Sequence, residues 1–391
     1  MKSRGRLIVL AVSIPVIAFA VVGGFMSKAS AREDPYRPLS IFNDVVDLIL
    51  NNYVEDVDLD KVMLGAMRGL AEGLDADSAY LTPEQAKAYG RGEQTAARNE
   101  TGLELTRQYY LRVIAARDGS PAAKAGFRPG DYIRAIDGTS TRDMSVVDGM
   151  RRLSGKPGTK VTLTVLRGNA AEPHDLSLVR EAVGASAPNG RIAAAGTGYV
   201  RVGEFTTATA AELKREIDAL TRQGAQRLVV DVRGAAFGDV DAGIAAARLF
   251  VKSGTIAIRR DRGQAQEPVT AAAGDGAVTL PVALLVDNGT SGAAEVFAGA
   301  LSGNKRASLV GEHTLGRAAK QKIVALPDGS AMLLTHLFYL TPSGQVIHEH
   351  GLTPDVAVEQ PDLEFGAPAP ATDPTLDKAI EQLASELKKA A

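Results

Sequence analysis

An apolar run that breaks into a glycine-rich turn and continues as an alanine-rich segment constrains this 391-residue chain most strongly. Val282–Val286 contains only apolar residues and predicts a buried strand, and GTSG (289–292) follows two residues later. The pattern of 292–302 then predicts a helix. A strand, a tight turn and a helix in this order present a side chain beside the backbone N–H groups of the helix N-terminus. The stretch therefore predicts a candidate reactive turn.

The rest of the chain indicates several domains. From Gly196 onward predicted strands and helices alternate, which favours an α/β core domain over 190–362. Short strands separated by Gly-rich turns indicate a second domain over 98–183, and helical patterns occupy 34–95. The length and the 45% apolar composition are sufficient for two or three domains with cores of their own.

Composition excludes several classes of function. The net charge of −2 predicts no basic surface for a nucleic acid. The absence of cysteine excludes disulfides, thiol catalysis and cysteine-ligated metals. Of the five histidines only His348 and His350 are close in sequence, and a surface location is the preferred interpretation of that pair over a metal site. We therefore expect no cofactor, no metal ion and no nucleic-acid partner.

The N-terminus has the pattern of a targeting segment. Three basic residues within the first six positions precede an uncharged run over 7–26, and Ala29–Ala31 offers a small-residue cleavage site. The run is also long enough to span a membrane, so a cleaved signal peptide and an uncleaved anchor are both open for 1–31. We expect an exported protein in the periplasm or at the extracytoplasmic face of the inner membrane. Any membrane contact is expected through this segment alone.

Four stretches together resemble the carboxyl-terminal (tail-specific) processing proteases, which are PDZ-containing serine peptidases with a Ser/Lys dyad. The stretches VDNGTSGAAEVFAGAL and LVGEHTLGRAAKQ align without a gap on the family patterns G-S-A-S-A-S-E and G-E-R-T-F-G-K-G-S-V-Q. RLVVDVRGAAFGD (227–239) and YLTPSGQVIHEHGLTPDVAVE (339–359) match two further family elements. The resemblance implies a mixed α/β multidomain chain, with a PDZ domain over 98–183 and a protease core of the ClpP/crotonase-like type over 190–362.

The same alignment assigns the site positions. It places Gly292 at the position of the nucleophile and Arg317 at the position of the base, while Gln321 keeps the residue type that orients the base. An arginine stays protonated in proteins, so Arg317 is expected to orient substrate or stabilise an anion and not to accept a proton.

Three interpretations of the turn remain open at the level of sequence. In the first, Ser291 is the nucleophile, Lys320 is the base if that segment is helical, and the Gly292 N–H donates to the oxyanion. In the second, the fold binds peptides without cleaving them. In the third, Ser291 is the N-cap of the helix that follows.

A further loop is implied to complete the site. In the loop after the strand that ends at Asp231, the residues Asp231, Arg233 and Gly238 match the family, and the resemblance implies that the Gly238 N–H helps to form the oxyanion hole. Ala235, Ala236 and Phe237 depart from the family pattern. We expect Asp231 and Arg233 to form a structural ion pair and not to act in catalysis.

The segments TGLEL, DGSPAAKAGFRPGDYIRAIDG and VTLTVLR resemble a PDZ domain of the bacterial protease type. A PDZ domain adds an extended peptide as a strand and holds its terminal carboxylate in a nest of backbone amides. The resemblance places the carboxylate loop at Thr101, Gly102 and Leu103, and the other wall of the groove at Val147 and Met150. The implied partners are unstructured C-terminal tails of proteins.

The C-terminal segment 363–391 has the pattern of a linker followed by a helix. Asp373–Pro374 starts the helix, whose apolar stripe needs a partner in its own core or in a second subunit, so we expect a possible homodimer. The sequence thus predicts an exported serine-type endopeptidase that binds protein tails. The alternative is an inactive PDZ scaffold that binds tails without cleaving them.

Overall fold

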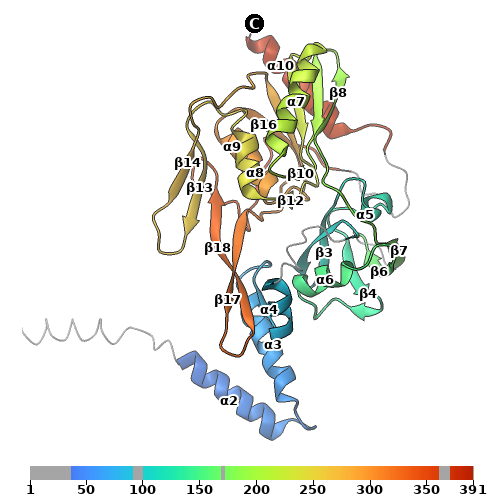
Figure 1. Cartoon of the computed structure of the whole chain (residues 1–391), viewed down its shortest axis with the longest axis vertical. Helices are drawn as coiled ribbons and strands as arrows, with labels where there is room; N and C mark the ends of the chain where they lie inside the picture. Colours follow the sequence, from blue (N-terminus) through green and yellow to red (C-terminus); the bar gives the residue numbers. More distant parts are fainter. Residues whose placement is uncertain (1–36, 91–99, 169–171, 361–369, 391) are drawn as a thin grey trace, which may run out of the picture. The chain divides into compact units, whose positions relative to one another are not determined.

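The computed structural model describes residues 37–90, 100–168, 172–360 and 370–390 (Figure 1). The chain divides into two compact units, residues 1–67 and 68–391. The expected targeting segment 1–31 lies outside the described residues. No helix within the described ranges is long and apolar enough to cross a membrane.

The first unit contains α2 (Arg37–Asn52) and most of α3 (Leu59–Glu72). Both lie within 34–95, where helical patterns were predicted, and both are confirmed as helices. The stripe of α2 is largely exposed, since Ile41, Val45 and Leu48 each keep 46–61% of their surface accessible.

A small sheet domain follows within the second unit, and its strands have the order β2-β3-β4-β6-β7 with β5 beside β4. Alternate residues of these strands are buried in one core with the apolar side of α6, as the two-residue period of strands requires. The Ser145 hydroxyl caps α6 by accepting the Asp148 N–H at 3.1 Å. The elements are β2 (Leu103–Gln108), β3 (Tyr110–Ala116), α5 (Pro121–Lys124), β4 (Tyr132–Ile136), β5 (Thr139–Ser140), α6 (Val146–Leu153), β6 (Lys160–Leu166) and β7 (His174–Val179).

The core domain is built on a sheet with the order β19-β16-β15-β11-β9-β8, parallel except for the β8–β9 pair. The predicted strand Val282–Val286 is confirmed as β15, and the predicted helix 292–302 is confirmed one residue later as α9. The elements are β8 (Asn189–Ala194), β9 (Thr197–Arg201), α7 (Thr209–Arg222), β11 (Arg227–Asp231), α8 (Val240–Ala247), β15 (Val282–Val286), α9 (Ala293–Gly303), β16 (Ala307–Gly311), β19 (Val356–Ala357) and α10 (Pro374–Ala390).

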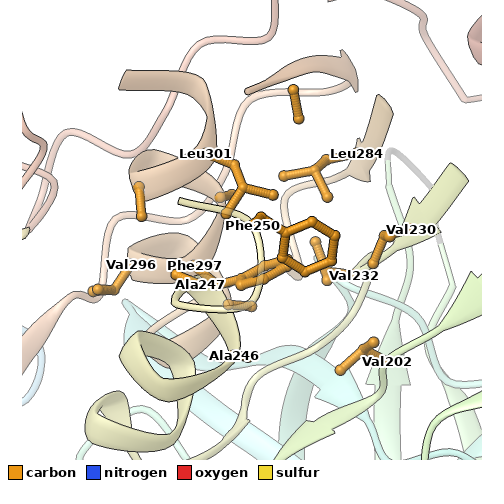
Figure 2. Close-up of a cluster of buried hydrophobic side chains, with 14 of the residues drawn as sticks. Val202, Val230, Val232, Ala246, Ala247, Phe250, Leu284, Val296, Phe297 and Leu301 are labelled. Atoms are coloured by element: carbon orange, nitrogen blue, oxygen red, sulfur yellow. The ribbon is translucent and has the colours of Figure 1, made fainter. Parts of the chain in front are cut away.

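Two apolar layers cover the two faces of this sheet. Val230 and Leu284 point to the face that carries α7, α8 and α9, where Phe250 and Phe297 pack at the centre of the cluster shown in Figure 2. The neighbouring residues on the same strands point to the other face and pack against α10. The apolar stripe of α10 therefore packs within the core of its own chain. The stripe no longer supports the expected homodimer.

An antiparallel sheet completes the domain, with the order β1-β18-β13-β14 and β17 paired with β18. Its segment 319–325 is a strand, so the helix that was expected to bring Lys320 beside Arg317 is wrong. A two-stranded parallel pair joins β10 to β12. The elements are β1 (Ala79–Leu81), α4 (Pro83–Gly90), β10 (Glu204–Phe205), β12 (Phe237–Gly238), β13 (Thr255–Asp261), β14 (Glu267–Thr270), β17 (Ala319–Ala325) and β18 (Ala331–Leu340).

Candidate active site

The turn between β15 and α9 is fixed to the loop that follows β11. The Asp287 carboxylate accepts the Gly234 N–H at 2.8 Å and the Gly289 N–H at 3.0 Å. The Thr290 hydroxyl donates to the Val232 carbonyl at 2.9 Å. Burial raises the pKa of Asp287 above its usual value. These bonds join two segments that are far apart in sequence, so the turn presents residues 291–293 in one defined geometry.

Gly292 occupies the sharpest point of the turn. It is the N-cap of α9, with φ 59° and ψ −115°, a backbone shape that costs an L-amino acid strain and that nucleophile turns between a strand and a helix adopt. A Cβ atom placed on Gly292 would meet only the Arg317 carbonyl oxygen, at 3.9 Å. The position therefore has the space for a side chain and lacks one.

Ser291 lies one residue before this point. Its side chain is buried, with 2% of the residue exposed, and it lines a cavity of about 170 Å³ with Gly292 and Ala293. The Ser291 hydroxyl makes no hydrogen bond within the described part of the chain. The interpretation of Ser291 as N-cap is wrong, because Gly292 is the N-cap and no side chain caps the helix there.

The backbone donors at the turn differ from the expected ones. The Gly292 N–H donates to Glu295 Oε2 at 3.0 Å, so in this structure it does not serve as the oxyanion donor that was expected. The Ala293 N–H, by contrast, has no hydrogen-bond partner among the described residues, and Ala293 lines the cavity. In a strand-turn-helix site the donor is the N–H that follows the nucleophile. Ala293 is thus a candidate donor for position 292, and the sequence reasoning missed it because it counted from Ser291.

Gly238, the second expected oxyanion donor, lines the same cavity at the end of β12. Its φ is 116°, and a Cβ atom placed on it would lie 2.0 Å from the Phe205 carbonyl oxygen, so the position has room for glycine only. The neighbouring Phe237 is buried, and its ring centroid lies 4.3 Å from the Arg117 guanidinium carbon. The departure at 237 therefore places a buried aromatic ring in the wall of the cavity.

Arg317 is held by two carboxylates. Its Nε lies 2.5 Å from Asp77 Oδ1, and its Nη1 lies 2.9 Å from Glu104 Oε1. Burial alone would lower the pKa of Arg317, but the charges of Asp77 and Glu104 raise it above its usual value. Burial also raises the pKa of Glu104, against the opposing effect of Arg317. Arg317 consequently stays protonated and cannot take a proton from a serine.

Lys320 and Gln321 contact different partners, and the pairing of β17 with β18 shifts register between these two residues. Lys320 Nζ lies 2.8 Å from Asp241 Oδ2 at the start of α8, and no hydrogen bond joins it to Ser291. Burial lowers the pKa of Lys320, but the hydrogen bond to Asp241 and the charges of Asp239 and Asp241 act with the effect of Tyr339 to raise it above its usual value. Gln321 lines the cavity and donates to the Thr335 hydroxyl at 3.2 Å. The expected set Ser291, Lys320 and Gln321 is therefore not assembled in this structure.

Glu295 connects the turn to the loop that carries Arg317. Its carboxylate accepts four hydrogen bonds, from the Gly292 N–H at 3.0 Å, the Gly316 N–H at 2.6 Å, the Arg317 N–H at 2.7 Å and the Thr314 hydroxyl at 2.5 Å. The residue is fully buried, and burial raises the pKa of Glu295 to about 6 despite these donors. One carboxylate thereby sets the spacing between positions 292 and 317.

Asp231 and Arg233 form the structural ion pair that was expected, with Arg233 Nη2 2.6 Å from Asp231 Oδ2. Arg233 also binds Asp373 at the start of α10, at 2.7 Å. Burial alone would raise the pKa of Asp231, but its bonds to Arg233 and the charge of Arg201 bring it below its usual value. The pair anchors the loop behind the cavity and does not line it.

The expected peptide-binding residues separate into two groups. Thr101, Gly102 and Leu103 are buried, and the carbonyls of Thr101 and Gly102 accept backbone N–H groups of the same domain. Val147 and Met150 line a larger cavity of about 920 Å³, which also contacts Arg317 and Gln321. Within the described ranges no group of three or more His, Asp or Glu side chains is arranged to hold a metal ion.

Comparisons with known proteins give consistent matches. The family model for peptidase family S41 matches residues 196–358, and that for the PDZ domain matches residues 112–167. A carboxy-terminal-processing protease of Bartonella bacilliformis is 31% identical over 363 residues, covering 88% of this chain and 83% of that protein. A carboxyl-terminal-processing protease of Synechocystis is 34% identical, covering 78% of this chain and 72% of that protein. The solved structure of a photosystem II D1 C-terminal processing protease matches with a TM-score of 0.69 and 30% identity, over 80% of this chain and 85% of that one.

Proposed function

This chain belongs to the carboxy-terminal processing proteases of peptidase family S41, and we propose that it binds unstructured protein tails and hydrolyses peptide bonds in them as a serine-type endopeptidase. The observation that carries the proposal is the turn between β15 and α9, where the strained N-cap Gly292 and Ala293, whose N–H is unpaired among the described residues, line one cavity. Such a turn stabilises the oxyanion that forms when a hydroxyl adds to a peptide carbonyl.

On this proposal the PDZ domain holds the tail and the core acts on it. The cavity that contacts Val147 and Met150 also contacts Arg317 and Gln321, which supports passage of a peptide from the groove to the turn. Ser291 supplies the hydroxyl for a slow reaction, because the N–H that follows it, that of Gly292, is bound to Glu295. The proton of the hydroxyl must pass to a base. Lys320 can serve only after it leaves Asp241, because the carboxylate keeps the ammonium protonated.

Replacement of Ser291 tests the hydrolysis. The purified chain is expected to cleave a peptide that ends in apolar residues, and Ser291→Ala is expected to lower the rate by about 1,000-fold or more, as loss of a serine nucleophile does. Ser302→Ala, near the other end of α9, is the matched control and is expected to keep the wild-type rate. Chromatography of the peptide products gives the rates, and an equal rate in the Ser291→Ala variant contradicts Ser291 as the nucleophile.

The second candidate function is tail binding without cleavage. The specific observation in its favour is Arg317, which two carboxylates hold in its charged state beside a position 292 that has no side chain. The same assay separates the two functions. Binding of the peptide without cleavage by the wild-type chain or either variant supports the second function and contradicts the first.

We further propose that residues 1–31 direct export to the periplasm or to the extracytoplasmic face of the inner membrane, on the strength of the basic and apolar pattern there. After osmotic shock of an expressing bacterium, a released protein that begins near residue 32 is expected for a cleaved signal. A membrane fraction with an intact N-terminus is expected for an anchor. Retention of the intact chain in the cytoplasmic fraction contradicts export.

A further inference from the structure

The groove beside β2 is covered by a segment of the chain itself. A peptide bound to a PDZ domain adds to the edge of a strand and lies against a helix. Here β2 pairs with β3 along one edge, and α6 packs beside it. Residues 68–89, which comprise the end of α3, β1 and most of α4, contact both walls of this groove, and we call them the strap.

Charged and polar side chains connect the strap to each wall. On the β2 wall, Glu72 forms an ion pair with Arg107. On the α6 wall, Asp148 accepts a hydrogen bond from Gln85 Nε2 at 2.5 Å and lies 3.5 Å from Arg68 Nη2. A peptide that adds to β2 must pass between these two sets of contacts, so the strap spans the entrance of the groove.

The apolar part of the groove is also in contact with the strap. Val147, which was expected to contact a bound tail, packs against the cluster formed by Ala79, Leu81, Ala331 and Leu333, and Tyr89 packs against the same cluster. A residue of the α6 wall is therefore occupied by the strap and by β18.

The strap spans the groove without filling it. A cavity of about 920 Å³ remains between them, lined by Leu74 and Tyr80 of the strap and by Glu104 and Met150 of the groove. A volume of this size is typical of ligand sites. The strap thus encloses a site with room for a short peptide segment.

The strap and the groove strand also share one contact in the core domain. Asp77 of the strap and Glu104 of β2 bind the same guanidinium, that of Arg317. Movement of the strap away from the groove would remove Asp77 from Arg317. The position of the strap is therefore linked to the charge environment of the candidate active site.

We propose that the strap is an autoinhibitory cover, and that a protein tail reaches β2 only after the Glu72–Arg107 and Arg68–Asp148 pairs break. The inference rests on the proposed function, because the ligand that displaces the strap is a peptide tail. The side chains of these pairs keep 12–33% of their surface accessible to water. Solvent-accessible ion pairs contribute little to stability, so these two pairs can break without unfolding the domain.

Removal of the strap contacts is expected to increase affinity for a tail. A fluorescent peptide that ends in apolar residues is titrated with the full chain, and Kd is read from the anisotropy. The double variant Arg68→Gln/Glu72→Gln is expected to lower Kd by roughly 5-fold or more, because a larger fraction of molecules has an open groove. Lys124→Gln, which removes an exposed ion pair with Glu181 in the same domain, is the control and is expected to change Kd by less than about 2-fold.

A reversible cross-link tests the same inference in the closed state. The chain has no cysteine, so Glu72→Cys/Arg107→Cys introduces a single pair that a bis-methanethiosulfonate reagent joins. The cross-linked protein is expected to lose binding by roughly 10-fold or more, and a reductant is expected to restore it. Equal Kd values for the wild type and the opened variant, or unchanged binding by the cross-linked protein, contradict the autoinhibitory role of the strap and leave the proposed function standing. Absence of binding by every protein, including the opened variant, contradicts the strap and the proposed function together.

Discussion

The double variant Gly292→Ser/Arg317→Lys is expected to cleave a tail peptide about 1,000-fold or more faster than the unmodified chain. Position 292 has the backbone of a nucleophile turn, and a Cβ there meets only one atom within 4 Å. The Ala293 N–H that follows is unpaired in the described structure, and Ala293 lines the cavity beside Gly292. A nucleophile and its base act as a unit, and loss of either costs about a million-fold in a serine protease. The strain of an L-residue at this backbone costs about 1–3 kcal/mol and does not prevent folding.

The charges around position 317 determine how the cleavage rate of the double variant depends on pH. A lysine there would lie between Asp77 and Glu104, which favour its protonated form and so oppose its role as a base. We therefore expect the rate of the double variant to rise with pH. Addition of Asp77→Asn is expected to raise the rate at neutral pH further.

Two controls decide which position reacts. Gly292→Ala/Arg317→Lys lacks the new hydroxyl and is expected to be as slow as the unmodified chain. Addition of Ser291→Ala to the active double variant is expected to leave its rate unchanged, since Ser291 lies one residue before the turn position. A folded double variant that neither cleaves the peptide nor reacts with a fluorophosphonate contradicts the assignment of position 292 as the position of the nucleophile.

The fold was predictable because its signals are local. The apolar run of β15, the glycines of the turn and the alanine-rich α9 are contiguous, and strand and helix were predicted within one residue of their observed bounds. The family and the mixed α/β fold are confirmed for the same reason, since the motifs that indicate them are short and continuous. The Asp231–Arg233 pair joins residues two apart and was also predicted.

The chemistry of the site was less predictable because its contacts are long-range. The sequence identified Arg317 as a charged residue at the base position, but not its partner Asp77, which is 240 residues away. The expectation for Lys320 depended on a helix, and pairing with β18 made that segment a strand instead. The contact between the Gly292 N–H and Glu295 is the exception, because it is a local capping contact from the third helical residue that the sequence reasoning did not consider.

Glu295→Ala is expected to lower the free energy of unfolding by about 4 kcal/mol or more. The change leaves four donors without an acceptor, two of them in fully buried bonds, and each buried donor left unpaired costs about 1–3 kcal/mol. Glu312→Ala is the matched control, because its carboxylate accepts only an exposed backbone N–H among the described residues, and we expect a loss below about 1 kcal/mol. Urea denaturation followed by circular dichroism measures both values. Similar losses in the two variants would show that Glu295 does not hold the loop to the turn.

The pH dependence of Glu295→Gln separates the charge of this residue from its shape. Burial raises the pKa of Glu295 to about 6 from 4.5, so the fold favours the protonated form. The stabilisation from this group is complete below about pH 4.5 and is lost as pH rises through about 6, a change of about 2 kcal/mol. Wild-type stability relative to Glu295→Gln is therefore expected to fall by that amount between pH 4.5 and 7. Above pH 6 the charged carboxylate remains buried because its four donors join the turn to the Arg317 loop. If the stability difference between the wild type and Glu295→Gln does not change with pH, Glu295 is already ionised at pH 4.5. In that case the four donors outweigh the effect of burial on its pKa.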